Sequence, residues 1–166
     1  MQVRNLIVLV SCQLISSTGT FSLVTLGGLI GASLSSNKAL VTLPMSLTVV
    51  AGASATVPAA MLMRRVGRRA GSTLGSLIAA TGMALAFLAL KNGSFVLFCL
   101  GAMMLGVNVA FTQQYRFAAA ESVSTEYVPR AISFVLLGAI GGAFVGKEIA
   151  TRGHDWIPDI PYAGTM

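Results

Sequence analysis

The chain has 166 residues and a formal net charge of +6, and 55% of its residues are hydrophobic whereas only 10% are charged. An ordinary soluble domain carries roughly 25% charged residues, so this composition excludes a typical water-soluble globular protein. The charged residues gather in short segments and leave four long stretches without any charge, at 5–37, 39–63, 70–90 and 92–115. A helix that crosses the ~30 Å hydrocarbon core needs about 20 apolar residues. Each stretch is therefore long enough to span a membrane.

These stretches predict an all-α integral membrane bundle with five spans, at about 5–33, 39–63, 69–90, 94–116 and 129–150. The first is too long for the ~7–15-residue apolar core of a cleaved signal peptide, so we interpret it as a span. The charge-free part of the fifth is shorter, but Pro129 suits a first helical turn, and Arg130 and Lys147 can extend their charges toward the membrane surfaces. We treat residues 1–166 as one membrane domain.

The basic residues are divided unequally between the two sides of the predicted bundle. One side carries Arg4, Arg64, Arg65, Arg68, Arg69, Arg116 and Arg130, and the other carries Lys38, Lys91, Lys147 and Arg152. Cytoplasmic segments are enriched in Lys and Arg, so we predict a cytoplasmic N-terminus and an external tail at 151–166. This orientation explains the positive charge, and we expect the lipid bilayer rather than a nucleic acid as the partner of these residues.

Small residues recur every four positions along the fifth predicted span, at Gly138, Gly142 and Gly146. Residues with this spacing share one face of a helix, and small side chains let another helix approach closely. We therefore predict that this face packs against a neighbouring backbone.

Polar residues form one stripe on each of two predicted spans. The first span carries Gln13, Ser16, Ser17 and Thr20, and the fourth carries Asn108, Thr112, Tyr115 and Arg116. Hydrocarbon offers such groups no hydrogen-bond partners, so they face either a water-filled cavity or the interior of the bundle. The two interpretations are substrate contacts and hydrogen bonds that hold helices together.

Catalytic and metal-binding patterns are absent from the sequence, so we expect neither an enzyme nor a cofactor. His154 is the single histidine and has no partner at metal-ligand spacing, and Cys12 and Cys99 both fall inside predicted spans. We therefore predict no metal site.

The second and third predicted spans are joined by a tight turn at Arg65, Gly67, Arg68 and Arg69, where glycine permits a backbone angle that other residues resist. This segment resembles the loop between the second and third helices of the major facilitator superfamily, which reads Gly, three residues, Asp, Arg or Lys, any residue, Gly, Arg, Arg or Lys. Ala60 and Arg64 stand where the family has Gly and Asp. In the family this Asp helps to latch two halves of the transporter, so that latch is not expected here.

The fourth and fifth spans carry a second resemblance. The run 116–120, Arg-Phe-Ala-Ala-Ala, is similar to a bacterial branch of the superfamily, and Gly142 and Gly146 match its glycine-rich fifth helix. The resemblance covers five of the twelve helices of a complete member and stops near Gly164, about where a sixth helix would begin. It implies an integral protein of a bacterial inner membrane.

The resemblance to this superfamily implies the transport of a small solute, whose identity the sequence does not reveal, by alternating access around a central site. In the family the first and fourth helices line this site, which makes the candidate substrate contacts Gln13, Ser17, Thr20, Asn108, Thr112 and Arg116. Arg116 suits an anionic substrate group. Two alternative roles for Arg116 are to mark the cytoplasmic boundary of the membrane and to pair with Glu121.

The family mechanism moves one six-helix half against another. Five helices lack the opposing half, so we predict that solute transport needs another membrane protein chain or a self-oligomer. The alternative is an accessory or structural subunit of a larger membrane complex, which itself transports nothing.

Overall fold

The computed structural model describes residues 3–34 and 40–152. Regular structure in these residues is entirely helical, and five helical segments are long and apolar enough to cross a membrane. This confirms the predicted all-α membrane bundle with five spans. Lys38 and residues 153–166, which form most of the predicted external tail, lie outside the described residues.

The helices follow the predicted spans with two differences. They are α1 (Val3–Leu34), α2 (Leu43–Val66), α3 (Arg68–Asn92), α4 (Phe95–Gln113), α5 (Tyr115–Glu121), the 3-10 turn η2 (Thr125–Tyr127) and α6 (Val128–Arg152). The second span begins at Leu43 rather than at 39, because Pro44 suits the first turn of a helix. The fourth crossing does not end at 116, since α5 continues it to Glu121 after a turn at Gln114.

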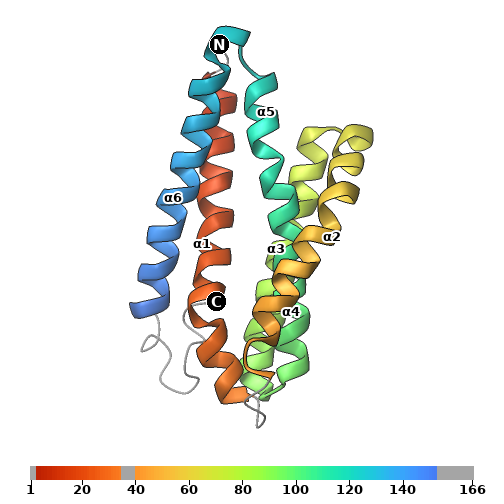
Figure 1. Cartoon of the computed structure of the whole chain (residues 1–166), viewed down its shortest axis with the longest axis vertical. Coiled ribbons are helices and arrows are strands. Elements are labelled where there is room, and N and C mark those ends of the chain that lie inside the picture. Colours follow the sequence, from red (N-terminus) through yellow and green to blue (C-terminus); the bar gives the residue numbers. More distant parts are fainter. Residues whose placement is uncertain (1–2, 35–39, 153–166) are drawn as a thin grey trace.

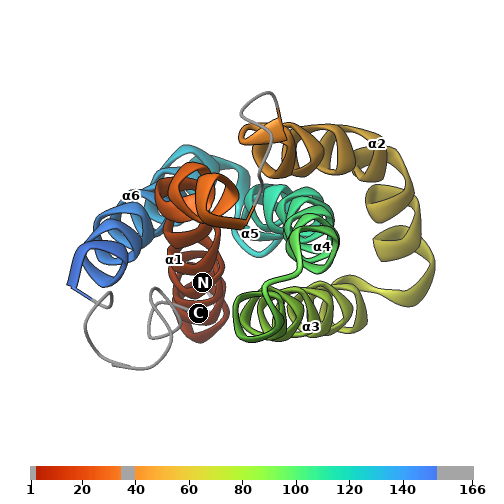
Figure 2. The same cartoon turned by 90° about the horizontal axis from the view of Figure 1, so that it is seen from below.

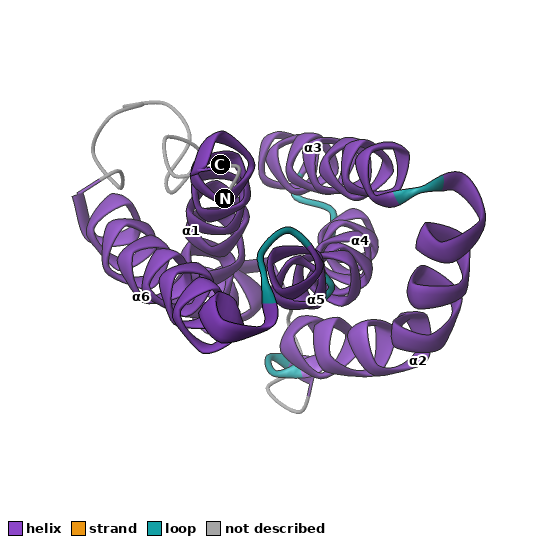
Figure 3. Ribbon diagram, turned by 90° about the horizontal axis from the view of Figure 1, so that it is seen from above, coloured by secondary structure: helices purple, strands orange, loops and turns teal. Residues whose placement is uncertain are grey.

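The crossing helices run alternately up and down, as Figure 1 shows. α6 lies along α1, while α2 and α3 lie along α4, and the α4–α5 crossing stands between these two groups (Figures 2 and 3). In its most apolar window the α4–α5 crossing is 56% buried, against 17–22% for each of the other four. It is therefore the central crossing, and the others expose most of their surface.

The outer surface is apolar in a way that only a membrane accommodates. Ile15, Val49 and Phe144 are 70%, 71% and 73% exposed, and they lie on three different helices. Exposed apolar surface of this extent is unfavourable in water but not in hydrocarbon. These side chains therefore face lipid or further membrane helices.

The glycines of α6 lie directly against the α1 backbone. A Cβ atom added to Gly138 would stand 2.9 Å from the Val10 carbonyl oxygen, and one added to Gly146 would stand 2.5 Å from that of Thr18. A Cβ at Gly142 would overlap the Leu14 carbonyl oxygen. The α1–α6 contact therefore depends on the absence of side chains at these positions.

Candidate functional site

The turn between α2 and α3 consists of one residue. Gly67 has φ 88° and ψ 159°, a conformation open to glycine and strongly disfavoured for other residues. Its N–H donates to the Met63 carbonyl at 3.1 Å, and its own carbonyl accepts from the Gly71 N–H at 3.1 Å. This geometry reverses the direction of the chain, so that α2 and α3 lie on opposite sides of α4 (Figures 2 and 3), and it places four arginines at one end of the bundle.

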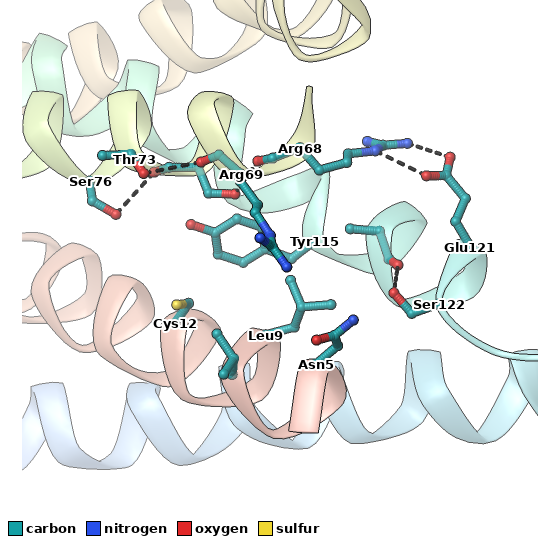
Figure 4. A pocket seen from close by; sticks show the side chains of 13 residues that line it. Asn5, Leu9, Cys12, Arg68, Arg69, Thr73, Ser76, Tyr115, Glu121 and Ser122 are labelled. Atoms are coloured by element: carbon teal, nitrogen blue, oxygen red, sulfur yellow. Dashed lines mark hydrogen bonds and ion pairs between the residues drawn. The ribbon is translucent and has the colours of Figure 1, made fainter. Parts of the chain in front are cut away.

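One of these arginines forms an ion pair with the end of α5. Arg68 donates from Nε to Glu121 Oε2 at 3.1 Å and from Nη2 to Glu121 Oε1 at 2.5 Å, as Figure 4 shows. Glu121 is therefore the partner of Arg68 and not of Arg116, which was one of the alternatives from sequence. Residues five apart point to different sides of a helix, so Arg116 and Glu121 diverge.

A cavity of about 770 Å³ lies beside this ion pair, between α1, α3 and α5. α1 contributes the apolar side chains Val8, Leu9 and Cys12, and Figure 4 shows Arg69 of α3 and Tyr115 of α5 on the opposite walls. Tyr115 is 1% exposed, and its hydroxyl has no hydrogen-bond partner. The cavity is thus mainly apolar on the α1 side, whereas the opposite side is polar and carries two arginines and the carboxylate of Glu121.

The polar stripe of α1 lies in part at the contact with α6. Gln13 and Ser17 are buried, and Gln13 Nε2 donates to Ser17 Oγ at 3.2 Å. A Cβ atom added to Gly142 would meet Ser17 Cβ at 2.6 Å, which places this side chain against α6. Thr20 Oγ1 donates to the carbonyl of Ser16 at 3.0 Å. Both hydrogen bonds lie within α1, so neither joins α1 to another helix, and the buried Gln13 Oε1 has no hydrogen-bond partner.

The polar stripe of α4 is buried more deeply and is less satisfied. Asn108 is 1% exposed, and neither its Oδ1 nor its Nδ2 has a partner. Thr112 Oγ1 donates to the Asn108 carbonyl at 2.9 Å, while Arg116 is half-buried and forms no ion pair with a described residue. A buried unpaired carboxamide destabilises a fold by about 1–3 kcal/mol, so its presence calls for a functional explanation.

The structure separates the predicted substrate contacts from the cavity, whose walls include none of Gln13, Ser17, Thr20, Asn108, Thr112 and Arg116. Sequence reasoning missed its α1 wall, although the spacing of Asn5, Leu9 and Cys12 along one helix face was a usable signal. Within the described ranges no group of His, Cys, Asp and Glu is arranged to hold a metal ion.

Two known proteins are similar to this chain over nearly all of its length. The sequence is 39% identical over 163 residues to the riboflavin transporter RfnT of Brucella anthropi, an alignment that covers 98% of this chain and 41% of that protein. It is also 26% identical over 147 residues to YdeG of Bacillus subtilis, an uncharacterized MFS-type transporter, with 88% of this chain and 34% of that protein covered. Its homologues are membrane transporters, one of them of the major facilitator type. The resemblance found in the sequence is thereby confirmed.

The chain spans 41% and 34% of the lengths of these two relatives, which are therefore more than twice as long as the part that matches. No protein-family model and no solved structure matches the chain. The membrane-spanning helices and the homologues together make it an integral membrane protein.

Proposed function

We propose that this chain forms five helices of a solute transporter and that riboflavin is the first substrate to test. The observation that carries this proposal is the 39% identity to a riboflavin transporter across 98% of the chain. Both relatives are named as transporters, which supports membrane transport in general and speaks against an enzyme.

Asn108 is the residue that we propose as the main polar contact for the substrate. It lies on the central crossing, where an unpaired carboxamide is unfavourable unless another group satisfies it in some state of the protein. A carboxamide offers an acceptor and donors side by side. This pattern complements the adjacent carbonyl and N–H groups of the flavin ring. Because Asn108 is buried here, the proposal requires a second conformation that uncovers it, as alternating access provides.

Arg116 is the second proposed contact. It lies at the arginine-rich end of the central crossing, half-buried, and within the described part of the chain it forms no ion pair. A guanidinium has five N–H donors, which suit the hydroxyl groups of a ribityl chain as well as an anion. Gln13, Ser17, Thr20 and Thr112 supply further hydroxyl and amide groups in this proposal.

We further propose that other membrane helices, from a second chain or another copy of this one, complete the transport pathway. Four of the five crossings are at most 22% buried in their most apolar windows, which leaves extensive surface for such contacts. The bacterial inner membrane with a cytoplasmic N-terminus is the proposed location, because the arginines gather at one end of the bundle.

A chimaera tests the function directly. This chain replaces the matching segment of the Brucella anthropi riboflavin transporter, and uptake of radiolabelled riboflavin is measured in a bacterial strain that cannot make riboflavin. We expect saturable uptake by the chimaera and none by this chain alone in liposomes. A chimaera that reaches the membrane but takes up no riboflavin would contradict the proposed substrate. Uptake by a demonstrated monomer of this chain would contradict the need for further helices.

Single substitutions then test the site. Arg116→Gln is expected to lower riboflavin uptake by about tenfold or more, since a hydrogen bond from a charged donor contributes about 1.5–3 kcal/mol. Arg130→Gln is the matched control, because Arg130 is exposed and lies 5.9 Å over the Tyr127 ring rather than in the bundle. Equal uptake by the two variants would remove Arg116 from the proposed site.

A further inference from the structure

The cavity between α1, α3 and α5 combines an apolar wall with a polar wall, in which Glu121 pairs with Arg68 and Arg69 leaves an excess positive charge. Its volume of about 770 Å³ falls within the roughly 300–1,000 Å³ typical of ligand pockets. Val8 and Leu9 line it from α1, and Val8 is 54% exposed, so the apolar wall continues into the lipid-facing surface of α1. An amphipathic ligand fits such a pocket better than a small polar solute does.

Arg69 is the group in this cavity that lacks a counter-charge. Figure 4 shows its guanidinium directed into the cavity, between Tyr115 and Leu9. In the described residues the ion pairs join Arg68 to Glu121 and Arg152 to Glu148, so Arg69 has no anionic partner there. The Arg69 side chain is exposed, so its guanidinium is accessible to an anion that enters from the membrane surface. Such an anion would come from outside the described residues, because no described carboxylate pairs with Arg69.

Tyr115 forms part of the cavity wall but is not a donor to a ligand there. Its side chain is buried, and its hydroxyl oxygen is closed off from the open part of the cavity. Figure 4 shows this hydroxyl on the side of the ring that faces Ser76 rather than Arg69. Ser72 and Ser76 donate to α3 carbonyls at 2.6 and 3.1 Å, which leaves Arg69 as the main donor of this wall.

The start of α3 adds a second contribution at the same place. No side chain caps the N-terminus of this 25-residue helix, and its first two residues, Arg68 and Arg69, line the cavity. The first backbone N–H groups of a helix and the positive end of its dipole favour anions. The start of α3 and the Arg69 side chain therefore both favour an anion at this end of the cavity.

We propose that this pocket binds the phosphate headgroup of an anionic phospholipid from the leaflet at the arginine-rich end. Arg69 donates to the phosphate oxygens, and Val8 and Leu9 contact an acyl chain. A membrane lipid is favoured over a free phosphate because the apolar wall is open toward the hydrocarbon. This site is separate from the proposed substrate contacts, none of which lines the pocket.

Native mass spectrometry of the purified chain tests the lipid site. The chain is transferred into nanodiscs of phosphatidylcholine with increasing amounts of phosphatidylglycerol, and retained lipid is counted. We expect the parent to retain phosphatidylglycerol preferentially and Arg69→Gln to bind it about tenfold more weakly or worse. Arg65→Gln removes the same charge from the same turn outside the pocket and should bind like the parent. Equal losses in both variants would mean only general surface attraction and would overturn the proposal.

Cys12 gives a second readout that needs no lipid release. It lines the cavity, whereas Cys99 is buried elsewhere and serves as an internal control. Phosphatidylglycerol should slow the alkylation of Cys12 by N-ethylmaleimide in the parent but not in Arg69→Gln. Equal protection in both lipids would indicate that a protein segment covers the pocket. Equal protection by inorganic phosphate would indicate a soluble anion. Either result would overturn the lipid site.

Discussion

Replacement of Gly142 by alanine tests the backbone contact between α6 and α1. The new Cβ atom would overlap the Leu14 carbonyl oxygen and would stand 2.6 Å from Ser17 Cβ and 3.1 Å from the Thr18 nitrogen. Two of these three atoms belong to the backbone, so they cannot move by a rotamer change. The two helices must therefore separate to admit one methyl group.

The adjacent glycine provides a matched control for this change. A Cβ atom at Gly141 meets only Leu14 Cδ1, at 3.6 Å, which is ordinary van der Waals contact with a flexible side chain. Both substitutions gain the same helix propensity, about 1 kcal/mol for glycine to alanine, so this contribution cancels in a comparison. Overpacking a tight contact costs about 1–3 kcal/mol. We therefore expect Gly142→Ala to be less stable than Gly141→Ala by about 1–3 kcal/mol.

The measurement is unfolding in mixed micelles of mild detergent and dodecyl sulfate, followed by circular dichroism, with both variants and the parent at equal concentration. Gly142→Leu extends the series and should destabilise further, because a larger side chain forces a wider separation. If Gly141→Ala and Gly142→Ala unfold at the same detergent composition, the α1–α6 contact is looser than the structure indicates, and the glycine spacing does not mark a backbone contact.

Three other changes test the remaining inferences. The first change tests orientation with single cysteines in a cysteine-free background and a membrane-impermeant thiol reagent on intact cells. The reagent should label Asn92→Cys on intact cells, whereas Val66→Cys should react only after lysis. The reverse pattern would contradict the proposed orientation. Gly67→Ala should destabilise the fold by about 1–3 kcal/mol, because the φ of Gly67 is 88°. Gly28→Ala is the control and should not destabilise the fold, because a Cβ atom there meets nothing within 4 Å. Equal stability of the two variants would refute the strain argument. Asn108→Leu should stabilise the fold in detergent by about 1–3 kcal/mol. The same substitution should abolish riboflavin uptake by the chimaera. A destabilised variant would mean that the Asn108 carboxamide has a hydrogen-bond partner, for example water.

The ion pair between Arg68 and Glu121 connects residues 53 positions apart, but its contribution to stability is small. The two side chains are 34% and 62% exposed, and exposed pairs contribute about 0–1 kcal/mol. The ion pair nevertheless determines which arginine is free to bind an anion. By binding Glu121, Arg68 leaves Arg69 as the basic group of the neighbouring cavity that lacks an anionic partner in the described chain.

The class of the protein was readable from the sequence because a membrane acts on each span separately. Every crossing must be about 20 residues long and almost free of charge, whatever it packs against, so the charge-free stretches predicted four of the five spans directly. The shorter fifth span also required Pro129 at its start and charges at its ends that can extend toward the membrane surfaces. The unusual backbone of Gly67 followed from the same local reasoning, since a turn between two closely spaced spans leaves few residues to reverse the chain. The closely spaced glycines of α6 likewise marked one helix face.

Tertiary structure decided what each face contacts. Helical periodicity shows that Gln13 and Ser17 share a side of α1, but only the packed bundle places Ser17 against Gly142 and leaves Asn108 without a partner. The pairing of Arg68 with Glu121 and the cavity between α1, α3 and α5 arise from segments distant in sequence. The helical periodicity and the composition of a sequence describe one helix at a time. Hydrogen bonds, ion pairs and cavities between helices depend on which helices become neighbours.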